Sequence, residues 1–86
     1  MYKLVYHPRV FKFLTKISKK EAKRIVEKIE ILDKNPLSEE LNVKKLASTK
    51  RSFRLRIGNF RVVFEVDFEN KIIYIHDVGF RRSIYQ

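Results

Sequence analysis

The sequence predicts a small α+β fold, in which an antiparallel, twisted sheet carries an N-terminal pair of antiparallel helices on one face. Residues 8–34 place apolar side chains at helical spacing in two runs, whereas residues 53–66 alternate apolar and basic side chains around a Gly-Asn pair. Residues 72–78 form a further apolar run of strand length. We therefore expect an N-terminal strand, two helices and a three-stranded C-terminal meander. With 86 residues, the chain is expected to form one domain over positions 1–86 around a single core.

The N-terminal part is expected to contain one short strand and one short helix. Residues 2–6 alternate, with Leu4 on the inner side. Pro8 then indicates a helix start, because its fixed φ suits a helix and its missing N–H is not needed in the first turn. The side chains that this helix would turn toward the core are Val10, Phe11, Leu14 and Ile17.

The second helix has sequence signals at both of its ends. Ser18 and Glu21 have the spacing of a capping box, in which each side chain binds a backbone N–H that the helix leaves unpaired. Asn35-Pro36 ends the helix, since the residue before a proline disfavours helical backbone. Residues 37–48 show no regular pattern and are predicted to be irregular. The apolar stripe of the helix consists of Ala22, Ile25, Val26, Ile29 and Leu32.

Gly58 and Asn59 are predicted to form the two-residue loop of the hairpin. Gly at the first position favours a type II′ turn, although Gly-Asn also fits type I′. Either turn fixes the register and places Arg56 directly opposite Arg61, because side chains of a strand alternate between its two faces. The face expected in the core collects Phe53, Leu55, Ile57, Phe60, Val62, Phe64 and Val66.

The other face of the hairpin is basic and is not expected in the core. It carries Arg54, Arg56 and Arg61 together with Val63 and Glu65. Like charges directly opposite each other on an antiparallel pair are destabilising, so stability alone gives no reason for this arrangement. A polyanion lying across the face would supply one. After the hairpin we expect a polar turn at 67–71, a third strand at 72–78 that Gly79 ends, and a short basic tail at 80–86.

The net charge of +10 points to a polyanionic or acidic partner, with nucleic acid first, an acidic protein second and an anionic membrane third. No apolar run approaches the roughly 20 residues of a membrane span, and the N-terminus lacks the features of a signal peptide, so a cytoplasmic protein without a membrane partner is expected. The sequence contains no cysteine and two histidines, so neither a metal site nor a cofactor is expected.

The candidate functional residues are cations. The sequence shows no paired carboxylates, nucleophile triad or Gly-rich phosphate loop, whereas arginine binds phosphate in a rigid bidentate fork. If RNA is the substrate, its own 2′-hydroxyl can serve as nucleophile, so that the arginines stabilise the phosphate while Tyr85 or His76 assists proton transfer. The cations considered are Lys44, Lys45, Arg54, Arg56, Arg61, Arg81 and Arg82.

The hairpin 53–64, followed by Val78-Gly79-Phe80-Arg81 and Tyr85, resembles the RelE/ParE superfamily of toxin–antitoxin toxins and looks most like an archaeal RelE. The resemblance covers nearly the whole chain. By position it implies catalytic roles for Arg54, Arg56, Arg61, Arg81 and Tyr85. The RNA contacts expected from Lys44, Lys45 and Arg82 follow from their place in the basic part of the sequence and not from the resemblance. Some members have lysines where this chain has Arg54 and Arg56. Since arginine in practice does not exchange protons, electrostatic stabilisation is the role to carry over.

The resemblance implies a metal-independent endoribonuclease that cuts mRNA on the ribosome and is silenced by a small acidic, RelB-like antitoxin, in a heterotetramer or another toxin–antitoxin complex. Two alternatives stay open. The ParE branch resembles inhibitors of DNA gyrase, and a basic RNA-binding module without catalysis fits the charge equally well.

Overall fold

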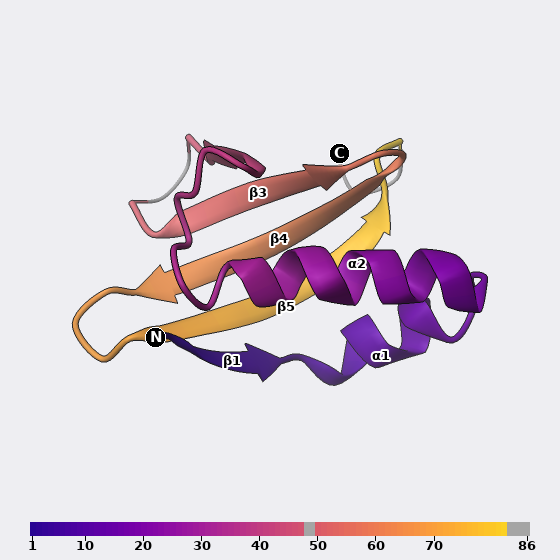
Figure 1. The fold of residues 1–86 in the computed structure, drawn as a ribbon, viewed down its shortest axis with the longest axis horizontal. Coiled ribbons are helices and arrows are strands. Elements are labelled where there is room, and N and C mark those ends of the chain that lie inside the picture. Colours follow the sequence, from indigo (N-terminus) through magenta and orange to yellow (C-terminus); the bar gives the residue numbers. More distant parts are fainter. Residues whose placement is uncertain (48–49, 83–86) are drawn as a thin grey trace.

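The computed structural model describes residues 1–47 and 50–82, which form a two-layer α+β fold (Figure 1). A five-stranded sheet has the strand order β1-β5-β4-β3-β2. Helix α2 runs back across the sheet in the direction opposite to α1 (Figure 1). The expected fold class and helix pair are therefore confirmed. The elements are β1 (Lys3–Tyr6), α1 (Pro8–Leu14), α2 (Lys19–Ile31), β2 (Asn42–Lys45), β3 (Ser52–Ile57), β4 (Phe60–Asp67) and β5 (Ile72–Phe80).

The sheet differs from the expected one in two ways. First, it is mixed, because β1 pairs with β5 in parallel, with Lys3 opposite Ile72 and Tyr6 opposite Ile75. Second, a strand lies within the segment expected to be irregular: β2 pairs antiparallel with β3 as the edge of the sheet. Its sequence, Asn-Val-Lys-Lys, has one apolar residue, which is too little for an alternation pattern.

The N-cap at Ser18 and the hairpin turn are confirmed, but only half of the capping box is seen, because the Glu21 carboxylate accepts from the Ser18 hydroxyl and not from the Ser18 backbone N–H. The Glu21 N–H donates to Ser18 Oγ over 3.1 Å, and the Ser18 hydroxyl donates to Glu21 Oε1 over 3.1 Å. The hairpin pairs Ile57 with Phe60 around the Gly58-Asn59 loop. Gly58 has φ of +54° and Asn59 does not have a positive φ, which decides for the type II′ turn.

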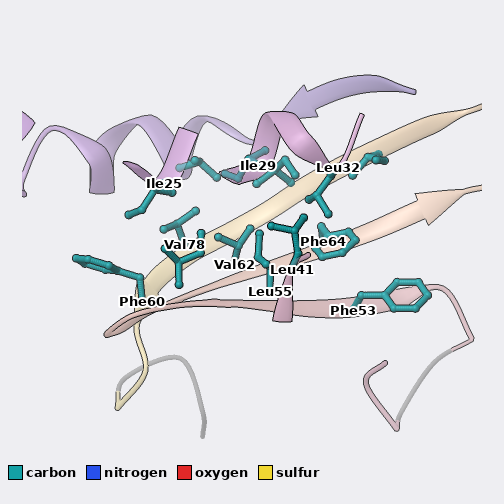
Figure 2. Packing of buried hydrophobic residues seen from close by; sticks show 14 of the residues in the cluster. Ile25, Ile29, Leu32, Leu41, Phe53, Leu55, Phe60, Val62, Phe64 and Val78 are labelled. Carbon is teal, nitrogen blue, oxygen red and sulfur yellow. The ribbon is translucent and has the colours of Figure 1, made fainter. Parts of the chain in front are cut away.

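The core lies between α2 and the sheet. Ile25 and Ile29 of α2 and its C-cap residue Leu32 point onto residues of β3 and β4, and all three are fully buried (Figure 2). Each such side chain contributes about 1.5–3 kcal/mol on burial, so this stripe fixes α2 on the sheet. The seven hairpin residues predicted for the core are all buried: Phe53, Leu55, Ile57, Phe60, Val62, Phe64 and Val66.

The prediction of Phe11 as a core residue is wrong. Phe11 is 53% exposed, and its ring packs against Tyr6 with centroids 5.4 Å apart. Helix α1 is only seven residues long and buries Val10, so the neighbouring position turns outward. None of the helices in the described part of the chain is long and apolar enough to cross a bilayer.

Strand β5 also departs from the prediction, because Gly79 lies inside it and does not end it. The register between β4 and β5 shifts in mid-strand: Val63 pairs with Asp77, but Phe64 pairs with Ile75. One extra residue, His76, is therefore accommodated in a β-bulge. The bulge keeps Ile75 and Val78 both buried, although they are three positions apart.

Candidate nucleic-acid interface

The face of the sheet turned away from the helices carries the predicted arginines. In one row across the strands, Asn42, Arg56, Arg61 and Gly79 are consecutive partners on β2, β3, β4 and β5. In the next row the partners are Lys44, Arg54, Val63 and Asp77. Both described helices lie on the opposite side of the sheet (Figure 2). Four strands thus bring residues that are distant in sequence onto one surface.

Two of these arginines are much less accessible than the sequence predicted. Arg54 is 9% exposed and Arg61 is 5% exposed, although this face was not expected in the core. Arg56 lies next to both, on the same strand as Arg54 and directly opposite Arg61. Gly79, the partner of Arg61 on β5, has no side chain. The result is a compact group of guanidinium side chains set into the sheet surface.

The charges of these side chains act on one another. Burial lowers the pKa of Arg54, and the charges of Arg56 and Arg81 lower it further. Burial likewise lowers the pKa of Arg61, followed by the charges of Arg54, Arg56 and Arg81. Arginine nevertheless stays protonated at any physiological pH. We call Arg54, Arg56, Arg61 and Arg81 the arginine cluster, which is a site where a bound anion would relieve repulsion already present in the fold.

Arg81 directly follows β5, and a backbone hydrogen bond holds it next to the hairpin turn. Its N–H donates to the carbonyl of Asn59 over 2.8 Å, so the β4–β5 pairing continues to the hairpin turn. The half-buried Arg81 also lines a hollow of about 480 Å³, together with the exposed Arg82 and the rings of Phe60 and Phe80.

The two lysines predicted as RNA contacts lie on different faces. Lys44 is exposed and is the partner of Arg54, so it extends the basic surface to the edge strand. Lys45 pairs with Phe53, whose ring is in the core, and therefore projects to the helix side of the sheet. Tyr85, the remaining predicted site residue, lies outside the described residues.

The sequence did not reveal a second group of polar side chains on the arginine face. His76 Nε2 and Glu65 Oε1 are 3.1 Å apart. The rings of Tyr74 and His76 are stacked, with centroids 6.5 Å apart and an angle of 17° between planes. The pairing of Glu65 with Tyr74 could have been found from the meander, but the position of His76 depends on the bulge. In the described ranges, no group of three or more potential metal-ligating side chains is placed to hold a metal ion.

Comparison with known proteins decides the family. The family model described as "ParE toxin of type II toxin-antitoxin system, parDE" matches residues 4–85. The chain belongs to the RelE/ParE family of toxins. A curated relative from Methanocaldococcus jannaschii, named "Putative toxin RelE1", is 35% identical over 81 residues, which is 93% of this chain and 90% of the relative.

Solved structures agree with this family. The crystal structure of an archaeal RelE–RelB complex from Pyrococcus horikoshii contains a chain with 30% identity and a TM-score of 0.84, covering 95% of this chain and 97% of that one. A RelB–RelE antitoxin–toxin complex from Methanococcus jannaschii matches with 29% identity and a TM-score of 0.77, covering 94% of each chain. The suspected resemblance to archaeal RelE proteins is confirmed.

Proposed function

We propose that this toxin inhibits translation by cutting mRNA on the ribosome, using the 2′-hydroxyl of the RNA as nucleophile. The observation that supports this best is the arginine cluster, in which Arg54 and Arg61 are almost fully buried and lie among other positive charges. A phosphodiester entering the cluster would gain charge-assisted hydrogen bonds and relieve the repulsion between these charges.

The reaction needs little else from the protein. The 2′-oxygen attacks phosphorus, the bond to the 5′-oxygen breaks, and a 2′,3′-cyclic phosphate and a 5′-hydroxyl result. Negative charge grows on the phosphate oxygens as the new bond forms, and fixed donors aimed at it lower the barrier without reorganisation. The arginines cannot shuttle the proton from the 2′-oxygen to the leaving 5′-oxygen. Tyr85 and His76 both stay candidates for assisting that transfer, and the contact between His76 Nε2 and Glu65 leaves the other ring nitrogen of His76 available.

We further propose that a small acidic, RelB-like antitoxin silences the chain in a heterotetramer or a related complex. Both archaeal RelE structures described above were solved as complexes with RelB. A net charge of +10 favours an acidic partner through electrostatic complementarity.

The gyrase-inhibitor alternative has one specific observation in its favour, which is that the matching family model is named after ParE. RelE-type nuclease activity is nevertheless the better supported reading, because the relatives that share about 30% identity or more carry RelE names.

The test is in-vitro translation with the purified chain, with new mRNA 5′ ends mapped by primer extension. We expect ends at ribosome-engaged codons, none without ribosomes, and a loss of about 100-fold or more in cleavage for Arg61→Ala and Arg81→Ala. Lys20→Ala removes the same charge from an exposed position of α2 and should cleave like the parent. Circular dichroism melting establishes that the variants are folded.

Translation arrest with intact mRNA would refute nuclease activity. A supercoiling assay with gyrase would then separate a ParE-type inhibitor from a passive RNA-binding module.

A further inference from the structure

The polar group next to the arginine cluster contains two aromatic rings on the open face of the sheet. Tyr74 is the β5 partner of Glu65 and is half-buried, and the side chain of His76 is 45% exposed. Their rings are nearly parallel, at 17°. Glu65 fixes the imidazole through the 3.1 Å contact to Nε2. Two nearly parallel aromatic rings held in this way differ from the polar side chains that usually cover a solvent-facing strand.

The bulge in β5 creates this surface. It lets His76 and Asp77 both avoid the core while Ile75 and Val78 remain buried. Bulges are over-represented next to functional sites, where they redirect a side chain. Here the redirected side chain is His76, which joins Tyr74 and Glu65 on the face that holds the arginines.

We propose that Tyr74 and His76 form a stacking site for one base of single-stranded RNA, adjacent to the phosphate bound by the arginine cluster. This inference rests on RNA being the ligand of the proposed function. Bases of single-stranded RNA stack on aromatic side chains without requiring a particular sequence. The site therefore holds the strand in position and does not take part in bond breaking.

The charges on this part of the face select a base over a phosphate. Glu65 and Asp77 are carboxylates on the same side of β4 and β5 as the two rings. Their negative charge repels a phosphate but not an uncharged base. The cationic end of the face, with Arg54, Arg56 and Arg61, has the opposite preference. A strand crossing the sheet thus meets a site for its backbone and then a site for a base.

The separation of the two sites suits neighbouring parts of one strand. Arg54, Val63 and Asp77 are consecutive partners, so one strand lies between Arg54 and the bulge next to His76. With strands spaced by about 4.8 Å, the two backbones are about 10 Å apart. An RNA strand held at the arginine cluster can therefore reach the rings without leaving the sheet.

The first experiment uses the full chain and a short single-stranded RNA whose 2′-hydroxyls are replaced by fluorine, so that it is not cleaved. One base at a time is replaced by 2-aminopurine, whose fluorescence falls when it stacks on an aromatic ring. We expect strong quenching at one position of the oligonucleotide. His76→Ala and Tyr74→Leu should abolish the quenching and weaken binding by about fivefold to 100-fold.

Matched variants separate stacking from other roles. His76→Phe and Tyr74→Phe keep a ring but lose the imidazole and the hydroxyl, and both should retain the quenching and most of the affinity. If His76 instead transfers a proton, His76→Phe will lose mRNA cleavage as severely as His76→Ala. Thermal melting identifies any variant that has lost its fold, and the ring-retaining variants still test the proposal in that case.

The outcomes also distinguish this proposal from the proposed function. A parent chain that does not bind the RNA, or binds it without quenching at any position, overturns the stacking site even if mRNA cleavage on the ribosome is observed. Quenching that persists in both His76→Ala and Tyr74→Leu overturns it as well. Position-specific quenching without any cleavage would support the stacking site and refute the nuclease.

Discussion

Replacing Arg56 by methionine should make the protein more stable and less active. Arg56 faces Arg61 directly and lowers the pKa of both Arg54 and Arg61. Its Nε is fully buried, and none of the described residues accepts a hydrogen bond from it. Methionine keeps a chain of similar length on the sheet but removes the charge and the unpaired donor. The substitution therefore relieves repulsion without opening a cavity.

The gain can be estimated from these two effects. Unfavourable like-charge pairs across strands are worth up to about 1 kcal/mol, and losing an unpaired buried donor adds to this. A gain of about 1 kcal/mol raises the melting temperature of a domain this small by about 4–8 °C. Because the main cause is electrostatic, the gain should shrink in 1 M salt, where the Debye length falls to about 3 Å.

The assay is thermal melting of the parent and Arg56→Met at low and high salt, followed by the translation assay. Lys20→Met serves as the control, since it removes one positive charge from an exposed part of α2, away from the cluster. We expect no comparable gain for the control. An Arg56→Met protein that melts at or below the parent temperature, or whose gain is independent of salt, would refute this reasoning.

Three further predictions concern the turns and the core. Gly58→Ala should cost about 1–3 kcal/mol in urea unfolding, because φ is +54° and an added Cβ would lie 3.2 Å from Arg24 Nη1; an unchanged midpoint would contradict this. Ile29→Ala removes a fully buried side chain and should cost about 2–5 kcal/mol, whereas a cost below 1 kcal/mol would mean a poorly packed core. Hydrogen bonds from Asn70 lower the pKa of Asp67, so its contribution to stability is present above the ordinary value of 3.8 and is lost as pH falls through the lowered value. Asn70→Ala removes the side-chain hydrogen bond, keeps the one from the backbone N–H, and should move that pKa part of the way toward 3.8 in an NMR titration; no change would exclude the side-chain hydrogen bond as the main cause.

The sequence predicted those elements whose signals are local. Ser18 and Glu21 determine the start of α2, and the Gly58-Asn59 loop determines the register of the hairpin. That register alone was sufficient to bring the arginines of β3 and β4 onto one face. Position within an alternating pattern decides the face of a side chain, so this part of the site was predictable.

Features that depend on distant strands were not predictable in this way. The sequence of β2 becomes a strand because the edge of β3 offers it backbone partners, and β1 runs parallel to β5 because of where α1 and α2 return the chain. Gly79 was expected to end a strand, but in the structure it pairs with Arg61 inside one. The burial of Arg61 also depends on distant segments, because the side chains of the neighbouring strands decide how much of it is exposed to solvent.

The position of β5 bears on when the protein becomes functional during its own synthesis. This strand is the last described one in the sequence, yet it lies inside the sheet between β1 and β4. Ile73, Ile75 and Val78, which complete the core, leave the ribosome only after both helices and the hairpin. Domains acquire their native packing as units, and contacts between distant segments form late. A nascent chain therefore cannot assemble its arginine cluster until β5 has emerged.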